Sequence, residues 1–395
     1  MIYLVILLLL LFLSIRYDIN GVYRHKNLWY RIVLVAFILL AGLRWRLGVD
    51  TTGYLVSFYH KYTNLSIDDL SIGNSPLFVV INSFVRSLGG RFYVVQLIQA
   101  TFVNVLIFIY IKKHSKYIFT CLFFYALFAF FNYNMEIMRG SMSIVICLFA
   151  NDFIIERKWI KGYFLYFVAL LFHPQTILLL VLPIFFFIRL NKVGFLFLIA
   201  AFIIGKIIID LFGDYLFLFA GDEMLEEKVN SYLESDKFSI QGGNIGFYLA
   251  TIFPLLFYPV VTLIFVKHFC PNSNLLKFEP FIMLGLAFSM VRMNVEIAYR
   301  YIDYYYIYFF LFYAEFFVEL IKRGEKIDWK VAYLRSFSIF FPVIFLSIGY
   351  MFFSSNGQGF RYYPYTSVLN RQVDSNREMK FSSLINYNRP NKNEY

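Results

Sequence analysis

Charged residues are scarce in this chain of 395 residues. They make up 15% of it, whereas an average soluble domain carries roughly 25%. Hydrophobic residues make up 60%, which is more apolar surface than a water-soluble fold of this size can cover. The strict alternation of a membrane β-barrel is missing, and long apolar runs such as 195–209 and 252–266 stand in its place. We therefore predict an all-α polytopic membrane protein, because helices satisfy their own backbone hydrogen bonds in lipid.

The sequence also lacks the motifs of soluble enzymes and of metal sites. It has no Walker A loop, no GxGxxG turn, no HExxH and no GxSxG. Its three cysteines and five histidines form no group with the spacing of zinc ligands. We predict no metal and no cofactor, and no nucleotide hydrolysis by this chain.

The net charge of +11 does not predict nucleic-acid binding in a chain of this kind. Most cations lie in short loops between apolar runs, where they set topology and meet anionic membrane lipids. The first apolar run has no cation before it and no small-residue cleavage pattern after it. We expect an uncleaved first span with its N-terminus outside, contacts with membrane lipids, and no nucleic-acid partner.

About twelve membrane spans are predicted from the apolar runs. They are expected at 2–15, 29–43, 92–111, 117–131, 138–155, 162–172, 174–188, 194–212, 245–266, 278–291, 300–320 and 332–353. The inner loops then hold 18 Lys and Arg, against 10 in the longer outer connections before the tail, in agreement with the positive-inside rule. We expect one transmembrane domain over 1–353, with outer loops 44–91 and 213–244, and a polar extracytoplasmic tail over 354–395.

Two segments decide this topology. Residues 76–88 are short and interrupted by polar side chains, so we expect an interfacial or re-entrant helix on the outer face. Residues 162–188 are expected to cross twice, with the turn at His173 and Pro174, because a single crossing would place the cations that follow on the outside.

Ionisable residues at the outer ends of the spans are candidates for function, since such positions are costly. Arg44 and Arg46 flank a tryptophan where the second span ends, and arginine binds phosphate through two parallel hydrogen bonds. Gly48 allows close approach of a ligand to the backbone, and Asp50 and Tyr54 follow. An interfacial anchor is the alternative interpretation, because Trp and Arg both suit the headgroup region.

Two further motifs lie at predicted outer ends. Glu136 and Arg139 are three residues apart and share one helix face, so they are candidates for function or form a local ion pair. His173 precedes Pro174, which restricts it toward extended geometry. A helix break in a membrane is tolerated where it lines a cavity, so His173 is a candidate proton carrier or phosphate ligand, or else a plain polar cap.

A fourth motif is short and heavily charged. It contains Arg292, Tyr299, Arg300 and Asp303 between two apolar runs. Arg300 and Asp303 share a face, and mutual neutralisation is the alternative to function. Several arginines and a histidine on one face suit an anionic amphiphile, and the aromatic content of 22% suits stacking against sugars.

The order of these motifs resembles the EpsG-like branch of the Wzy-type polysaccharide polymerases. The residues that carry the resemblance are RxRxGxDxxxY at 44–54, MRG at 138–140, ERKWIK at 156–161 and LFHP at 171–174. The resemblance spans most of the chain and is strongest over 40–190. Gly140 and Ser141 replace the usual glutamine after the arginine, and Gln175 replaces a small residue after His-Pro.

The resemblance implies a function. Proteins of this kind lengthen a surface polysaccharide at the outer leaflet of the bacterial plasma membrane. They transfer a growing glycan from its polyprenyl diphosphate carrier onto a new lipid-linked repeat unit, as metal-independent glycosyltransferases with a bundle of the GT-C type. The bond to the carrier stores the energy, which agrees with the missing nucleotide motif. A chain-length regulator protein is a possible partner.

The resemblance and the residue types together suggest roles for the candidates. We expect the arginines to bind the diphosphate and stabilise the leaving group, His173 to assist or act as base, and Asp50 or Glu136 to activate the acceptor hydroxyl. The expected catalytic residues are Asp50, Glu136, Arg139 and His173. The expected substrate-binding residues are Arg44, Arg46, Tyr54, Arg292, Tyr299, Arg300 and Asp303.

Other functions remain as alternatives. A flippase for lipid-linked oligosaccharides would place charges through a central cavity and show two related halves, whereas these charges gather outside. An O-antigen ligase shares the donor, so only the acceptor distinguishes it. A polytopic acyltransferase needs an inner acyl-donor site, and the inner loops offer only short basic clusters.

Overall fold

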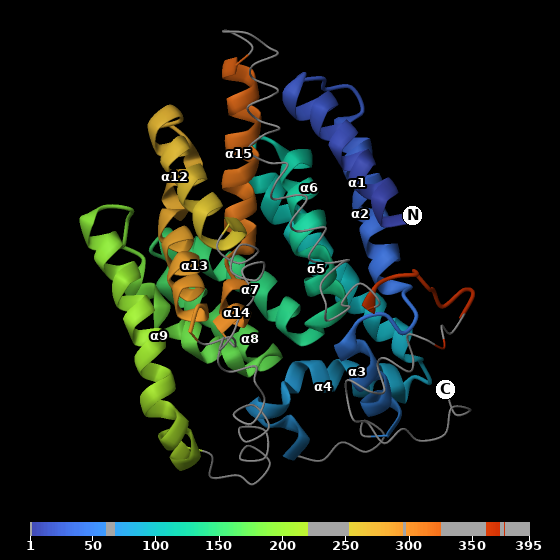
Figure 1. The fold of residues 1–395 in the computed structure, drawn as a ribbon. Helices are drawn as coiled ribbons and strands as arrows, with labels where there is room; N and C mark the ends of the chain where they lie inside the picture. Colours follow the sequence, from blue (N-terminus) through green and yellow to red (C-terminus); the bar gives the residue numbers. More distant parts are fainter. Residues whose placement is uncertain are drawn as a thin grey trace.

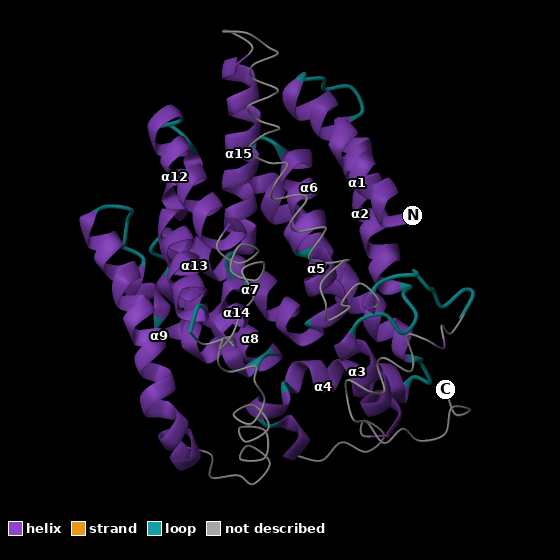
Figure 2. Ribbon diagram, in the orientation of Figure 1, coloured by secondary structure: helices purple, strands orange, loops and turns teal. Residues whose placement is uncertain are grey.

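Helices account for nearly all of the regular structure that can be described. The computed structural model describes residues 2–60, 68–219, 253–294, 298–324, 361–371 and 375. Within them, strand-like pairing is limited to an isolated bridge between Arg44 and Ser367, and Figure 2 draws the described parts as helices and loops. The predicted all-α class is confirmed for this part of the chain.

The α-helices follow one another with short connections. They are α1 (Ile2–Leu13), α2 (Lys26–Gly42), α3 (Val49–His60), α4 (Pro76–Ser87), α5 (Phe92–His114), α6 (Ile118–Phe128), α7 (Met138–Ile155), α8 (Trp159–Phe172), α9 (Lys192–Phe219), α12 (Tyr258–Phe269), α13 (Glu279–Arg292), α14 (Tyr299–Ile302) and α15 (Tyr306–Gly324). π-helical turns occupy Ser14–Ile19, Asn132–Glu136 and Phe253–Phe257. Segments of 3₁₀-helix occupy Asp68–Leu70, Ile72–Asn74, Pro174–Leu180, Leu182–Phe185 and Asn274–Phe278.

The described residues contain four helices that could cross a membrane by length and composition. They are Ile2–Ile19, Phe92–His114, Met138–Ile155 and Asn274–Arg292. Shorter apolar helices are Pro76–Ser87, Ile118–Phe128, Trp159–Phe172 and Leu255–Phe269. The total of twelve spans and the GT-C-like bundle stay predictions, because the predicted span 332–353 and the start of 245–266 lie outside the described residues.

The long helices lie side by side, with α3 and α4 at the end of the bundle that is lowest in Figure 1. Helix α2 packs against α5, α7 against α8, and α9 against α13. The outward faces are apolar: α2 exposes a stripe made of Leu28, Ile32, Val35 and Leu39. Residues at this spacing share one face of a helix, so the stripe suits contact with lipid.

The two segments that decide the topology have different local structures. Residues 76–87 form α4, whose 12 residues span about 18 Å at 1.5 Å per residue, less than the roughly 30 Å of a bilayer core. Residues 174–180 and 182–185 form 3₁₀-helix after α8, with apolar side chains such as Ile177 and Ile184 exposed. Helix α4 is thus short for a crossing, and the interfacial or re-entrant position of 76–88 and the double crossing of 162–188 both stay predictions.

The predicted span 300–320 begins later than expected. The short α14 is followed by a turn at residues 303–305, and the long helix α15 starts at Tyr306. Asp303 therefore lies in a turn ahead of α15 rather than within it.

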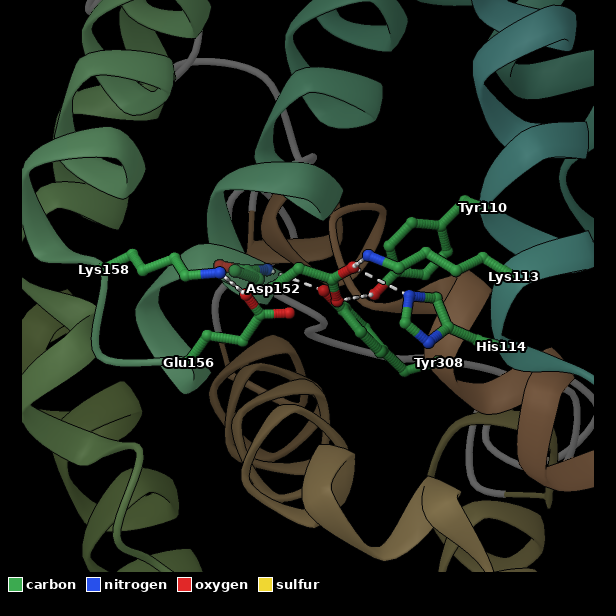
Figure 3. Close-up of polar contacts among 8 residues, drawn as sticks. Tyr110, Lys113, His114, Asp152, Glu156, Lys158 and Tyr308 are labelled. Atoms are coloured by element: carbon green, nitrogen blue, oxygen red, sulfur yellow. Dashed lines mark hydrogen bonds and ion pairs between the residues drawn. The ribbon is translucent and has the colours of Figure 1, made fainter.

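A polar cluster fixes the far end of α7. Asp152 accepts hydrogen bonds from Lys113 Nζ at 2.7 Å and Tyr110 Oη at 3.1 Å, and lies 2.8 Å from His114 Nε2 (Figure 3). These contacts join α7 to α5. Arg139 begins the same helix, so at 1.5 Å per residue the two positions are about 20 Å apart along it.

Candidate functional site

Arg139 lies between α3 and the start of α4. It occupies the first turn of α7, where its Nε donates to the Tyr54 hydroxyl at 2.7 Å and its Nη1 to Ser75 Oγ at 3.3 Å. Its guanidinium also lies 5.2 Å from the centre of the Tyr54 ring. Ser75 precedes Pro76 with a left-handed φ of 62°, which turns the chain into α4. Three segments far apart in the sequence thus converge on this arginine.

His173 lies beside the start of α7. Helix α8 ends at Phe172, and His173 adopts an extended conformation before Pro174. Its ring packs on Gly140, where an added Cβ would lie 3.4 Å from the His173 Cδ2. The imidazole therefore lies in contact with the first turn of α7.

The His173 ring is held neutral. Its Nε2 lies 3.0 Å from Gln175 Oε1, and its Nδ1 is buried with no partner among the described residues. The pKa of His173 is lowered to about 4, mainly by burial and also by the charges of Arg139 and Arg300, against the opposing hydrogen bond of Gln175. At neutral pH the imidazole can donate one hydrogen bond and accept another.

Asp303 is a buried carboxyl that shares a charged neighbour, Arg300, with His173. Its side chain accepts a hydrogen bond from Asn132 Nδ2 at 2.9 Å, and the residue is only 2% exposed. Burial raises the pKa of Asp303 to about 7, against the lowering effects of the Asn132 hydrogen bond and of Arg292 and Arg300. A carboxyl with this pKa exchanges its proton near neutral pH.

The remaining residues of the fourth motif line the same region. The guanidinium carbons of Arg292 and Arg300 lie 5.8 and 6.0 Å from the centre of the Tyr299 ring. Arg300 acts electrostatically on both His173 and Asp303. We call the set formed by Tyr54, Arg139, His173, Arg292, Tyr299, Arg300 and Asp303 the Arg139 cluster.

Arg44 has a different environment. It is fully buried, donating from Nη1 to the Ala41 carbonyl at 2.5 Å and from Nη2 to Thr51 Oγ1 at 3.2 Å. Burial lowers the pKa of Arg44 to about 9, while Tyr365, Glu136 and Tyr3 favour its charged form. The guanidinium therefore stays charged at neutral pH, inside the protein. Its predicted role in binding substrate stays a prediction.

A segment from the C-terminal part of the chain covers Arg44. The Trp45 amide donates to the Thr366 carbonyl at 2.8 Å, and the Gly48 amide donates to the Arg361 carbonyl at 3.1 Å. The Arg361 side chain lies 3.9 Å from Glu136 Oε2. We call residues 361–371 the cover segment. This part of the predicted polar tail is packed against the bundle.

Gly48 approaches the protein backbone rather than open space. Its φ is +87°, and an added Cβ would lie 1.9 Å from the Met135 carbonyl oxygen. Arg46 turns away with a φ of 51° and lines a separate pocket. The Asp50 side chain lies outside the described part of the structure. The described residues of the first motif thus lie in different surroundings and do not form one binding site.

Sequence analysis did not select two residues of the site. Ser75 and Asn132 bond directly to Arg139 and Asp303. Asn132 belongs to a run of three polar residues just before the Glu136–Arg139 motif. This run could have indicated that Asn132 belongs to the site. Ser75 had no comparable signal, because its contact depends on how α4 packs.

One other group has the residue types of metal ligands. Ligand atoms of Cys270, Glu315 and Glu319 lie within 4.8 Å of one another. Lys116 Nζ lies 3.1 Å from Glu315, and the Tyr117 hydroxyl lies 2.5 Å from Glu319. The charge and hydrogen bonds of protein groups thus already stabilise these carboxylates.

Comparison with known proteins identifies the family of the chain. No curated protein and no solved structure matches the chain. The model of the EpsG family matches residues 27–367, which include every residue of the Arg139 cluster and most of the cover segment. The resemblance suggested by the four motifs is confirmed, and the chain belongs to the EpsG family.

Proposed function

We propose that this protein joins lipid-linked oligosaccharide repeat units into a surface polysaccharide. Membership of the EpsG family indicates a membrane protein of the polysaccharide-polymerase type. The proposal adds a polyprenyl diphosphate-linked donor, no required metal, and a site on the outer leaflet of the bacterial plasma membrane. A chain-length regulator as a partner remains a prediction.

The observation that carries the proposal is the Arg139 cluster. It combines cations that suit a diphosphate with a buried carboxyl whose pKa is about 7. Fixed positive groups stabilise the charge that develops on a departing diphosphate. A base is most effective when its pKa lies near the working pH. Both requirements of glycosyl transfer from a diphosphate are thus met within one group of side chains.

Asp303 suits the role of base better than Glu136, one of the two carboxylates expected from the sequence. Asp303 lies with Arg300 and Arg292 in the cluster, whereas Glu136 lies against Arg361 of the cover segment. In the proposed step the Asp303 carboxylate takes the proton of the acceptor hydroxyl. The acceptor oxygen bonds to the anomeric carbon of the donor, whose bond to the diphosphate breaks. The polyprenyl diphosphate leaves with the bonding electron pair.

Arg139, Arg300 and His173 have complementary roles in this proposal. The two arginines neutralise the diphosphate as it departs. His173, with a pKa of about 4, is too weak a base to take a proton at neutral pH. Its neutral ring donates from Nε2 to Gln175 Oε1, so the unpartnered Nδ1 keeps a lone pair that would accept a hydrogen bond from a sugar hydroxyl in the bound state.

The test is product formation from defined lipid-linked repeat units by the purified protein. A ladder of products supports a polymerase. One transfer to a different acceptor indicates a ligase, and unchanged substrate moved across a vesicle indicates a flippase. Arg139→Ala is expected to lower the rate about 10²–10³-fold, as for loss of other groups that stabilise transition-state charge. A variant that is inserted normally and still makes the full ladder would refute the assignment.

A further inference from the structure

We propose that a pocket beside α3 binds an acidic sugar of the glycan, as a second site distinct from the Arg139 cluster. The inference rests on the proposed function, because it names the class of repeat unit on which the polymerase acts. The pocket has a volume of about 340 Å³, at the lower end of small-molecule sites. Its lining residues are Trp45, Arg46, Thr51, Leu55, Tyr59, Arg86, Gly89, Gly90, Arg91, Phe92, Tyr93, Gln96 and Arg371.

The charge of the lining points to an anion. The described residues that form it include four arginines and no carboxylate. Aromatic rings support the guanidinium groups: Arg86 lies 5.1 Å from the Tyr59 ring centre, and Arg46 and Arg371 lie 5.7 and 5.5 Å from that of Trp45. Guanidinium groups held on aromatic faces are suited to binding a carboxylate through two hydrogen bonds.

Two buried donors at the pocket have no acceptor. Gln96 is only 2% exposed, and its Nε2 has no hydrogen-bond partner in the described structure. The same is true of the Trp45 indole Nε1. Leaving a buried donor unpaired costs free energy, so each such group requires an explanation. Both side chains line the pocket, so a rotation of either side chain would offer its N–H to an oxygen atom of a bound sugar.

The apolar part of the lining distinguishes a sugar from a lipid. It consists of the aromatic residues Trp45, Tyr59, Phe92 and Tyr93, with Leu55 as its one aliphatic side chain. Sugar faces stack on aromatic rings, which combine apolar faces with polar edges. A polyprenyl chain needs an aliphatic path that these residues do not supply. An anionic sugar therefore fits the pocket better than a lipid diphosphate.

Helix α3 separates this pocket from the Arg139 cluster. Thr51, Leu55 and Tyr59 are spaced by four residues, so they form one stripe of the helix facing the pocket. Tyr54, on the neighbouring face, accepts the hydrogen bond from Arg139. A glycan held by its acidic sugar in the pocket would therefore present neighbouring sugars to the Arg139 cluster across a single helix.

Binding of a labelled glycan to the full chain in zwitterionic nanodiscs tests the inference. The probes are an oligogalacturonate and a maltooligosaccharide of equal length. We expect the acidic probe to bind more tightly by about tenfold or more, since charged hydrogen bonds are worth roughly 1.5–3 kcal/mol each. Its affinity should fall with salt. The double variant Arg86→Gln/Arg91→Gln should lose this preference.

A matched control removes two exposed arginines elsewhere. Arg16→Gln/Arg24→Gln lowers the net charge equally and should leave the preference unchanged. Arg371→Gln, in the cover segment, gives a second and milder test if the double variant does not fold. Equal affinity for acidic and neutral probes would overturn the inference. So would full displacement of the acidic probe by low concentrations of inorganic pyrophosphate, which would assign the pocket to the lipid diphosphate.

Measuring binding and polymerisation on the same variants keeps the two proposals separate. Arg139→Ala should still bind the acidic probe while polymerisation is lost. If Arg139→Ala polymerises normally and Arg86→Gln/Arg91→Gln loses binding, the proposed assignment of the reaction fails and the pocket stands. If Arg139→Ala is inactive and the acidic probe does not bind, the proposed assignment of the reaction stands and the assignment of the pocket fails.

Discussion

Asp303 is a buried acid that titrates near neutral pH. As the proposed base it must be ionised, so we expect kcat/KM for polymerisation to rise between about pH 6 and 8 and then level off, following the pKa of about 7. A pH–rate profile with a lipid-linked acceptor checks this. Asp303→Asn should lower the rate about 10²–10⁴-fold at pH 8, where the wild-type carboxyl is ionised, and should remove the rise of the rate with pH. A profile that is flat from pH 5 to 8 would contradict the assignment.

Ionisation of the Asp303 carboxyl should lower the stability of the folded protein, although it raises the rate. Its pKa is raised in the folded protein above the unfolded value of 3.8, so the folded state binds more protons between about pH 4 and 7. Stability should therefore fall as pH rises through this window. Asp303→Asn should flatten that part of the dependence, as measured by thermal unfolding in detergent at a series of pH values.

Gly48 is required by a close contact between two backbone segments. Gly48→Ala would place a Cβ 1.9 Å from the Met135 carbonyl oxygen at a φ of +87°, so we expect a loss of roughly 2–4 kcal/mol of stability. Gly53→Ala is the matched control, because nothing lies within 4 Å of its added Cβ and alanine favours helix. Equal melting temperatures for the two variants would be the contrary result.

The sequence predicted that several charged residues lie near one another better than it predicted what each of them contacts. The motifs around Arg139, His173 and Asp303 were found from charge beside helix ends. Arg44 was expected to face a ligand. Its burial could not be predicted, because it depends on the cover segment, which no local sequence pattern connects to Arg44. The proton affinity of Asp303 was also invisible in the sequence, since it arises from burial.

At the level of helices, the contacts of Asp152 join α5 to α7 (Figure 3). Asp152→Asn should lower stability by about 3 kcal/mol, since it leaves buried partners of the carboxylate unpaired. The rate per folded molecule should be nearly unchanged, because the site is at the other end of α7. Thermal unfolding measures the expected loss of stability, and the polymerisation assay measures the rate per folded molecule.

A neighbouring ion pair offers the control. Glu156 and Lys158 lie 2.6 Å apart with both side chains about half exposed. Exposed pairs contribute little, so Glu156→Gln should leave the melting temperature almost unchanged. If Glu156→Gln lowers the melting temperature as much as Asp152→Asn does, the contacts of Asp152 between α5 and α7 are not what stabilises this end of α7.

Helix positions followed from hydropathy where the apolar runs were long. The spans expected at 92–111 and 138–155 correspond closely to α5 and α7. The expectation was less accurate at 300–320, because Tyr and Asp residues there form a turn before α15. The 3₁₀-helix after Pro174 was also unforeseen, since hydropathy does not distinguish one helical type from another.

On the scale of the whole molecule, the cover segment closes the region around Arg44. Truncation before Arg361 should lower the melting temperature and the polymerisation rate together, because it uncovers a buried guanidinium and removes partners of Trp45 and Gly48. Adding the segment back as a peptide should restore part of both. A truncated chain with native stability and rate would show that the cover is dispensable.

The pairing of Trp45 with Thr366 also sets an order of events during synthesis. These residues are 321 positions apart, and ribosomes add roughly 5–20 residues per second. Arg44 is therefore synthesised tens of seconds before the cover segment that buries it. During that interval its charge must be solvated by water or lipid headgroups. The cover segment is thus made long after the loop that it pairs with, and a chain that stalls before residue 361 would be an inserted but unfinished protein.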